Sequence, residues 1–304
     1  MKYDQLKNQL ITLIGTSKPS FLILTVVCVL LGMAITVSSG YNVKPFPLLL
    51  VISGGFEAHL AVNVFNEYFD FRSGLDYKTI KTRFSGGSGS LQKSPEMAAP
   101  VFVFAAINLI LVFLIALYFL LSLGSIILLP FIPGILLIIF YDHYIVKKPF
   151  ICLFAPGIGF GFSIVAGINI ALTSTVCWKA LMISLIPFFL VNNLLLMNQF
   201  PDREADFSVG RKNVVIIYGK KASMRIYKLF MICTFIVIIL SAFLKIIPLF
   251  SLSGLVPLII ALIKMEAQKD VLEKHSSLTS FLSTNAFTVL LTPSLIAAGL
   301  FLKS

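Results

Sequence analysis

Residues 98–121, AAPVFVFAAINLILVFLIALYFLL, contain no charged side chain. About 20 apolar residues are enough to cross the hydrocarbon core of a bilayer as a helix, so this stretch predicts a transmembrane helix. Apolar runs of similar length recur along the 304 residues, of which 58% are hydrophobic and only 12% are charged. Because an ordinary soluble domain carries about 25% charged residues, the composition excludes a soluble fold. It predicts an all-α polytopic membrane protein.

The hydrophobic pattern predicts nine transmembrane helices. Their expected ranges are 21–39, 46–66, 98–121, 125–141, 151–172, 180–198, 226–243, 247–263 and 281–302. Residues 1–18 precede the first span and are amphipathic enough to lie along the membrane interface. No polar linker long enough to hold a second domain interrupts the pattern, so residues 1–304 are expected to form one transmembrane domain.

The distribution of Lys and Arg supports this topology. Of the 24 such residues, only Lys44, Lys179, Lys245 and Lys303 lie in the loops of one predicted side, and the other 20 lie on the opposite side. Cytoplasmic loops are enriched in Lys and Arg, so we expect a protein of the cytoplasmic membrane with its N-terminus inside. The net charge of +11 suits anionic lipid headgroups or a polyanionic substrate, and no nucleic-acid partner is expected. The sequence leaves the oligomeric state open.

A first acidic segment, NEYFDFRSGLD (residues 66–76), follows the second predicted span. On a helix, His59, Asn63, Asn66 and Asp70 share one stripe because their spacing is i, i+4, i+7 and i+11. Polar groups within a span normally face the bundle interior or a wet cavity, since lipid cannot solvate them. We therefore expect this stripe to face inward.

A second acidic segment, NQFPDREAD (residues 198–206), follows the sixth predicted span on the same side of the membrane. Asn198, Asp202 and Asp206 are one helical turn apart, and carboxylates so placed can share a cation. Mg²⁺ usually takes one or two carboxylates together with phosphate oxygens and water. Each acid alone is explained as a solvated loop charge, but the pairing of two such segments favours a shared site. The predicted metal ligands are Asp70, Asp76, Asp202 and Asp206.

The two acidic segments resemble those of the UbiA superfamily of intramembrane aromatic prenyltransferases, and the resemblance runs over most of the chain. It implies nine helices around a central cavity, Mg²⁺ as the cofactor, and transfer of a prenyl group from a polyprenyl diphosphate to an aromatic acceptor. The matching positions are Asn66, Asp70, Asp76, Asn198, Asp202 and Asp206.

Two features resemble the menaquinone branch of that superfamily, which implies 1,4-dihydroxy-2-naphthoate as the acceptor. One is the six-residue step from Asp70 to Asp76, and the other is RFSGGSG (residues 83–89). Two departures keep other acceptors open, namely 4-hydroxybenzoate, homogentisate or another lipid or quinone precursor. Many quinone-forming members have Arg where Pro201 stands, and residues 141–149, YDHYIVKKP, lack the expected glycines.

Further residues are candidates for the same site, within expected cytoplasmic active-site loops at 67–97 and 199–225. Asn66 and Asn198 are expected to bind the diphosphate together with six cations, Arg72, Lys81, Arg83, Arg203, Arg211 and Lys212. The cytoplasmic enrichment in basic residues explains each of these cations equally well. Asp70 and Asp202 are the expected catalytic carboxylates.

His59 and Tyr141 complete the predicted catalytic set. His59 either deprotonates or orients a phenolic acceptor, or it is a hydrogen-bonded core histidine. Tyr141 either contacts a substrate or anchors the helix at the interface. A transporter or another ion-binding membrane protein is the rival from a different class, but transporters tend to place their charges near the bilayer midplane on broken helices.

Overall fold

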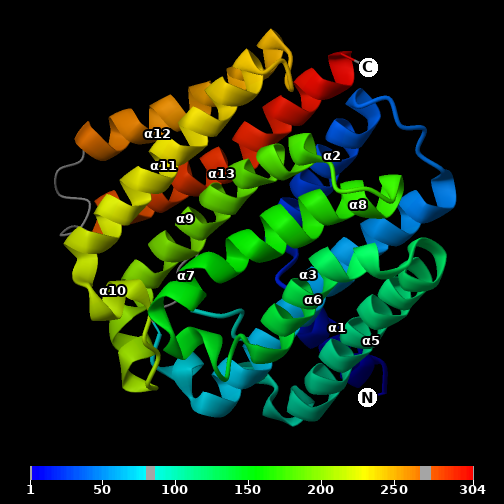
Figure 1. Cartoon of the computed structure of the whole chain (residues 1–304). Helices are drawn as coiled ribbons and strands as arrows, with labels where there is room; N and C mark the ends of the chain where they lie inside the picture. The colour runs from blue at the N-terminus through cyan, green and yellow to red at the C-terminus, as the bar shows by residue number, and fades with distance from the viewer. Residues whose placement is uncertain (1, 80–85, 268–274, 304) are drawn as a thin grey trace.

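The computed structural model describes residues 2–79, 86–267 and 275–303, and these residues form helices and no strand, as predicted. Figure 1 shows their arrangement. In chain order the longer helices are α1 (Lys2–Thr16), α2 (Ile23–Ser38), α3 (Pro45–Ser73), α5 (Ala98–Leu123), α6 (Leu128–Phe140), α7 (Pro149–Gly157), α8 (Gly167–Thr173), α9 (Trp178–Ser208), α11 (Gly219–Phe243), α12 (Leu255–Ala267) and α13 (His275–Lys303). Shorter helical pieces are η1 (Pro19–Phe21), η2 (Leu75–Tyr77), α4 (Ser90–Lys93), η3 (Pro95–Met97), η4 (Ser125–Ile127), η5 (Ile145–Lys147), η6 (Ile158–Ala166), α10 (Val214–Ile217) and η7 (Leu249–Gly254).

Seven helices of the described chain are long and apolar enough to cross a membrane. They span Pro45–Ser73, Pro95–Leu123, Pro149–Thr173, Trp178–Ser208, Gly219–Phe243, Leu249–Glu266 and Ser277–Leu302. The predicted span at 125–141 falls on the shorter apolar helix Ser125–Phe140. The predicted span at 21–39 falls on the second of two helices that are bent relative to each other. The count of nine crossings therefore stays a prediction.

The bent pair lies at the start of the chain. Leu6–Phe21 and Ile23–Ser38 are long and apolar enough to cross a membrane only when they are taken together, and they are bent by 50° relative to each other. Lys18 adopts a left-handed backbone with φ 48° just before η1, a conformation that is costly for a residue with a side chain. On α1, Leu6, Leu10 and Ile14 are each more than half exposed, so these apolar side chains form an exposed stripe along one side of the helix.

The helices of the bundle surround a cavity. In Figure 1, α3, α5 and α6 lie on one side, α11, α12 and α13 lie on the other, and α7 and α9 run between them. α3 packs mainly on α5, α13 on α2, and α11 on α9. The largest buried apolar cluster joins α2, α9, α11 and α13. The cavity borders this core, since Leu24 and Val191 belong to both, and it lies between α2, α3, α5, α6 and α9 and the continuous helix formed by α7, η6 and α8.

Both acidic segments begin on helices rather than in loops. The loops expected at 67–97 and 199–225 start later, because α3 continues to Ser73 and α9 continues to Ser208. Glu67, Asp70 and Asp206 face the protein interior instead of lipid, so the helices extend past the apolar stretches from which the boundaries were predicted. Pro201 lies inside α9 without ending it.

The segment η6 is a π-helix of nine residues, a rare form that often occurs at functional sites. At its start Gly157 packs against α9 so closely that a Cβ there would lie 2.4 Å from the backbone oxygen of Phe188. The backbone N–H of Gly157 donates to Asn192 Oδ1 at 2.6 Å. An irregular helix in a membrane needs such a partner, since lipid offers none for its backbone groups.

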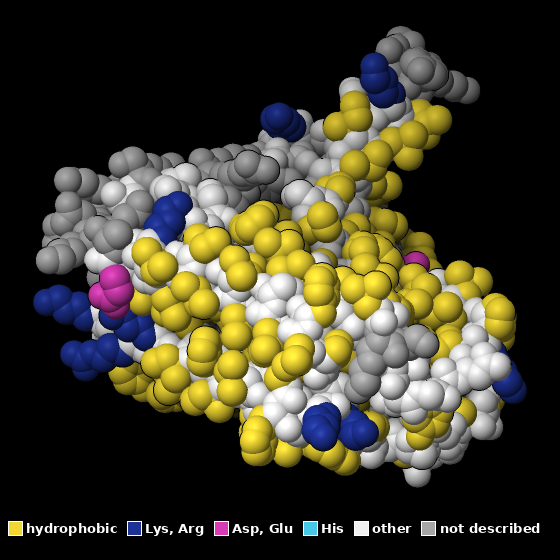
Figure 2. All heavy atoms as spheres, turned by 90° about the horizontal axis from the view of Figure 1, so that it is seen from above, with side chains coloured by type: hydrophobic (Ala, Val, Ile, Leu, Met, Phe, Trp, Pro, Cys, Tyr) yellow, Lys and Arg dark blue, Asp and Glu magenta, His cyan; other side chains and the backbone are white. Residues whose placement is uncertain are grey.

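Hydrophobic side chains cover most of the face shown in Figure 2, and Lys and Arg lie mainly toward its margins. The exposed apolar residues include Leu114, Leu121, Ile236, Ile263 and Phe287 on four long helices. A surface of this kind suits contact with lipid chains, since soluble monomers rarely expose contiguous apolar patches of more than a few hundred Å².

Gly157 offers a test of the close packing between η6 and α9. We expect Gly157→Ala to destabilise the protein by about 1–3 kcal/mol through overpacking, seen as a lower thermal transition of the detergent-purified protein. Gly159→Ala is the matched control, because its Cβ would lie 3.6 Å from Leu137 Cδ1, an ordinary contact. Equal transitions for the two variants would contradict this packing.

Candidate active site

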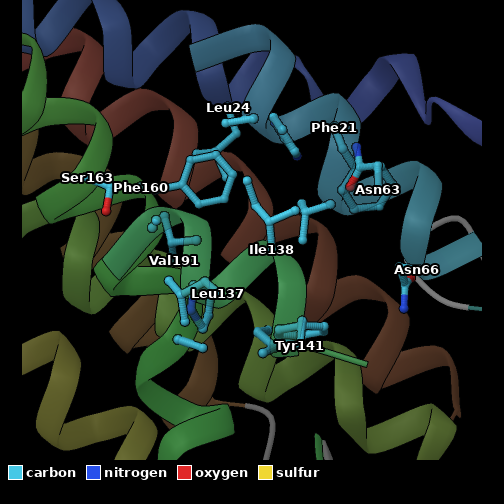
Figure 3. Close-up of a pocket in the computed structure, with 18 of the residues that line it drawn as sticks. Phe21, Leu24, Asn63, Asn66, Leu137, Ile138, Tyr141, Phe160, Ser163 and Val191 are labelled. Carbon is cyan, nitrogen blue, oxygen red and sulfur yellow. The ribbon is translucent and has the colours of Figure 1, made fainter. Parts of the chain in front are cut away.

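The internal cavity has a volume of about 640 Å³. Most of its wall is apolar, and Figure 3 shows Leu24, Leu137, Ile138, Phe160 and Val191 along it. Its polar end is formed near the C-terminal ends of α3 and α9 and by the turn after α9. The charged and amide side chains that line this end include Lys18, Asn66, Asp70, Asp76, Asn198, Gln199, Asp202, Asp206, Arg211 and Asn213.

The polar stripe predicted on α3 is present. His59, Asn63, Asn66 and Asp70 all line the cavity. His59 lies deeper in the bundle, where its Nδ1 is 2.7 Å from Thr25 Oγ1 and its ring meets Phe160 edge to face at 4.9 Å. The helical spacing thus carries polar groups from the charged end of the cavity into its apolar part.

Asn66 links three charged residues. Its Nδ2 donates to Asp70 Oδ2 at 3.0 Å and to Asp142 Oδ1 at 2.9 Å, and its Oδ1 accepts from Lys18 Nζ at 3.1 Å. Burial raises the pKa of Asp142, although the hydrogen bond from Asn66 and the charge of Arg211 oppose the shift. Burial also raises the pKa of the neighbouring Tyr141 well above its ordinary value, so this phenol stays protonated and can donate a hydrogen bond.

Arg211 joins the two acidic segments. Its guanidinium bonds to Asp70 of the first segment, and its Nη1 lies 3.1 Å from Asp206 Oδ1 of the second. Burial opposes the charge of Arg211, but Asp70 and Asp206 outweigh it and raise its pKa, so the residue remains a cation. Two carboxylates that would otherwise repel each other in a desolvated cavity are therefore held together by one cation.

Glu67 of α3 binds Ser88, which lies in the glycine-containing stretch after the first acidic segment. This carboxylate is only 1% exposed, accepts from the Ser88 backbone N at 2.9 Å and from Ser88 Oγ at 2.5 Å, and pairs with Lys18 at 3.0 Å. Gly87 has φ +67°, and a Cβ there would lie 2.5 Å from Asp76 Oδ1, so only glycine fits this approach. The Gly87 backbone and the Asp76 carboxylate thus lie against each other at the polar end of the cavity.

Three predicted diphosphate-binding cations are not at the cavity. Arg72 and Lys212 are exposed, and Arg203 donates from Nε to the Val215 backbone oxygen at 3.4 Å. None of the three lines the cavity wall. Arg72 is two residues from Asp70, which places it about 200° around the helix from the inward stripe. Lys81 and Arg83 lie outside the described residues.

Sequence reasoning overlooked Asp142 and Glu67. Asp142 follows Tyr141 directly after an apolar helix, and an acid at that place is the only local signal. Glu67 lies within the first segment, but its partners Lys18 and Ser88 are distant in sequence. Long-range pairing of this kind cannot be read from spacing on one helix.

The donor set at the polar end fits Mg²⁺. No group of three or more His, Cys, Asp and Glu side chains in residues 2–79, 86–267 and 275–303 is arranged to hold a metal ion alone. Mg²⁺ rarely uses such a cage and is usually bound through one or two carboxylates, substrate phosphate oxygens and water. The four predicted ligands, Asp70, Asp76, Asp202 and Asp206, all line this end, so one or two of them could hold an ion jointly with a diphosphate.

Comparison with known proteins identifies the fold. Residues 25–300 match the model of the UbiA prenyltransferase family. A structure of digeranylgeranylglyceryl phosphate synthase is similar at 22% identity over 95% of this chain and 98% of that one, with a TM-score of 0.64. A UbiA homologue from Archaeoglobus fulgidus was solved with DMAPP and Mg²⁺ (17% identity, 91% and 98% covered, TM-score 0.59) and with GPP and Mg²⁺ (16%, 94% and 99%, TM-score 0.62). No curated protein matches the sequence.

The buried pair of Lys18 and Glu67 gives a second prediction. Lys18→Met leaves Glu67 buried without its cation, and we expect a loss of about 3 kcal/mol in the free energy of unfolding. The thermal transition of the detergent-purified protein measures it. Combining Lys18→Met with Glu67→Gln should recover part of the loss, and Lys212→Gln, at an exposed site, should change little. A Lys18→Met variant as stable as the wild type would show that the pair contributes nothing.

Proposed function

This chain belongs to the UbiA prenyltransferase family, and we propose that it transfers a polyprenyl group from a prenyl diphosphate to an aromatic acceptor with the help of Mg²⁺. The observation that carries the proposal is the cavity itself. Its polar end gathers Asp70, Asp76 and Asp202 with Asn66 and Arg211, and the remainder of its wall is apolar. A prenyl diphosphate has the same division between a polyanionic head and a hydrocarbon tail.

At the polar end, Mg²⁺ and Arg211 have different roles. One or two of the carboxylates of Asp70, Asp76, Asp202 and Asp206 would hold each Mg²⁺ ion, which would draw charge from the diphosphate as it leaves. Arg211 is placed to pair with phosphate oxygens, since a guanidinium can bind them bidentately. Asn66 and Asn198 add amide groups, and Asn198 Oδ1 is buried with no hydrogen-bond partner in the described residues. Structures of a homologue with DMAPP or GPP and Mg²⁺ support a prenyl diphosphate donor and this metal.

The apolar part of the cavity suits the other half of the reaction. An allylic cation is destroyed by water, and the wall formed by Leu24, Ile138, Phe160 and Val191 excludes it. Phe160 is also placed for a cation–π contact, because its ring lines the cavity beside His59. The cation then forms a C–C bond to an electron-rich ring, which regains aromaticity by losing a proton, or CO₂ where the alkylated carbon bears the carboxylate, and the product tail leaves toward lipid.

For the acceptor we propose 1,4-dihydroxy-2-naphthoate, in menaquinone biosynthesis. The support is the six-residue step from Asp70 to Asp76, together with a cavity in which polar groups continue past the charged end. His59, Asn63 and Tyr141 line this region, and the protonated Tyr141 hydroxyl can donate to an acceptor oxygen. His59, with Nδ1 held by Thr25, is placed to orient a ring hydroxyl through its other nitrogen or to deprotonate it.

The membrane setting follows from the apolar helices and the family together, and the chain is a multi-pass membrane protein. We propose the cytoplasmic membrane, with the N-terminus and the acidic segments on the cytoplasmic side as the distribution of Lys and Arg favours. The transporter alternative has no support in a family match of this breadth to prenyltransferases.

An alkylation assay tests the proposal. Purified protein in detergent or liposomes receives a labelled polyprenyl diphosphate, Mg²⁺ and each of a panel of acceptors: 1,4-dihydroxy-2-naphthoate, 4-hydroxybenzoate, homogentisate and a glyceryl phosphate lipid. We expect labelled product with the naphthoate, abolished by EDTA and restored by Mg²⁺. Asp70→Asn and Asp202→Asn should each lower kcat/KM by about 100-fold or more, the usual size for loss of a charged group that stabilises the transition state.

Arg72→Gln and Lys212→Gln serve as controls, because both side chains are exposed and lie off the cavity wall. They should retain most of the activity. If no acceptor is alkylated, or if the two Asp variants keep full Mg²⁺-dependent activity, the proposed site is wrong. Product with a different acceptor alone would reject the naphthoate while keeping the reaction.

A further inference from the structure

The side-chain amide of Asn66 faces charged groups on both sides. Its Nδ2 donates to Asp70 Oδ2 at 3.0 Å and to Asp142 Oδ1 at 2.9 Å, and its Oδ1 accepts from Lys18 Nζ at 3.1 Å. An amide nitrogen carries two hydrogens, so the two carboxylates take both of them. The oxygen is therefore the part of the amide that remains for a cation.

Asp70 and Asp142 together set the orientation of this amide. If the amide were turned over, its oxygen would face two carboxylates and its hydrogens would face the ammonium of Lys18. The hydrogen-bond partners of an Asn side chain decide which of these two orientations is adopted. Without Asp142, one of the two hydrogens would lose its carboxylate acceptor, and the turned orientation would meet one carboxylate fewer.

Asp142 lies outside the cavity wall. It comes just after α6, while Asn66 belongs to α3 and Lys18 precedes η1. Asn66 and Lys18 line the cavity, and Asp142 does not. A carboxylate in this place influences a bound molecule by holding Asn66 rather than by touching the molecule.

The segment that carries Asp142 is held from two sides. The ring of His143 meets Phe69 of α3 edge to face, with the ring centroids 4.3 Å apart. On the other side, the Lys212 N–H donates to the Val146 carbonyl at 2.9 Å. Phe69 belongs to the first acidic segment and Lys212 follows the second, so the fold itself fixes the place of Asp142 beside Asn66.

We propose that Asp142 is a positioning residue that holds the Asn66 amide with its oxygen toward the cations of the polar end. This role rests on the proposed function and sharpens that of Asn66, which the sequence placed among the groups that bind the diphosphate. The amide hydrogens are taken by Asp70 and Asp142, so they do not reach a phosphate oxygen. The amide oxygen suits Lys18 or an Mg²⁺ ion bound with the diphosphate, since Mg²⁺ prefers oxygen ligands. An amide that is already held loses less rotational freedom when a ligand binds.

Binding of inorganic pyrophosphate tests this role without turnover. Protein in detergent is titrated with pyrophosphate by calorimetry at a fixed concentration of Mg²⁺, and the thermal transition of each variant is recorded alongside. The variants are Asp142→Ala, Asp142→Asn, Asn66→Ala and the combination of Asp142→Ala with Asn66→Ala. Lys147→Gln is the matched control, because Lys147 lies on the same segment as Asp142 and is exposed.

We expect Asp142→Ala to weaken pyrophosphate binding about tenfold, which is the size of one lost charge-assisted hydrogen bond. Asp142→Asn should retain most of the affinity, because its amide oxygen can accept the same hydrogen from Asn66. The combined variant should be no weaker than Asn66→Ala alone, since Asp142 acts through Asn66. Lys147→Gln should match the wild type.

Exchanging donor and acceptor gives a second test. Asn66→Asp places a third carboxylate beside Asp70 and Asp142, and it should remove most of the binding. Asn66→Asp combined with Asp142→Asn again sets a donor opposite an acceptor, so it should recover part of the loss. This pair of variants decides the matter if Asp142→Ala does not fold.

Binding that falls as far in Asp142→Asn as in Asp142→Ala would overturn the assignment, because the charge of Asp142 and not its hydrogen bond would then matter. Losses that add in the combined variant, or no recovery in the exchanged pair, would overturn it as well. A wild-type protein that binds pyrophosphate but alkylates no acceptor would reject the proposed transfer reaction and leave this assignment intact. A wild-type protein that binds no pyrophosphate in the presence of Mg²⁺ would reject both.

Discussion

The bridge from Arg211 to Asp70 and Asp206 is the interaction on which the architecture of the site depends. A desolvated carboxylate is costly unless it is paired, and the polar end of the cavity brings together carboxylates from helices far apart in the sequence. One guanidinium between the two segments offsets that repulsion and fixes the end of α3 relative to the end of α9. The extended network from Arg211 through Asp70 and Asn66 reaches Lys18, so the bent N-terminal pair is tied to the same point.

Two segments that border the cavity depart from regular helix geometry. The π-helix η6 and the left-handed Lys18 each depart from regular helix geometry, and each is compensated by a specific contact. Asn192 satisfies the Gly157 N–H, and Glu67 and Asn66 hold the Lys18 ammonium. Both departures lie at the cavity wall, and η6 also packs into the buried core through Val165.

The sequence was informative wherever a property repeats along one helix. Composition predicted the all-α membrane fold, and the spacing of His59, Asn63, Asn66 and Asp70 predicted the stripe that lines the cavity. The same spacing could have excluded Arg72, which lies on the opposite side of α3. Contacts between distant segments were not predictable, because the pairing of Glu67 with Ser88 and of Asn66 with Asp142 depends on how loops return to the bundle. Helix ends were misplaced for a related reason, since hydropathy does not register a charged residue that faces inward.

The carboxylates lie at one end of the cavity, and His59, Asn63 and Tyr141 line the region beyond it. This separation explains why membership of the family indicates the type of reaction but not the identity of the acceptor. In the proposed mechanism the acidic segments contact the diphosphate and its metal, which every prenyl donor shares. The acceptor meets the region lined by His59, Asn63 and Tyr141, where Thr25 fixes the imidazole and burial keeps the phenol protonated. Substitutions there should therefore alter which ring is alkylated, while substitutions among the carboxylates should slow the ionisation of the donor whatever the acceptor. The choice of acceptor and the rate of donor ionisation then depend on different side chains of the same cavity.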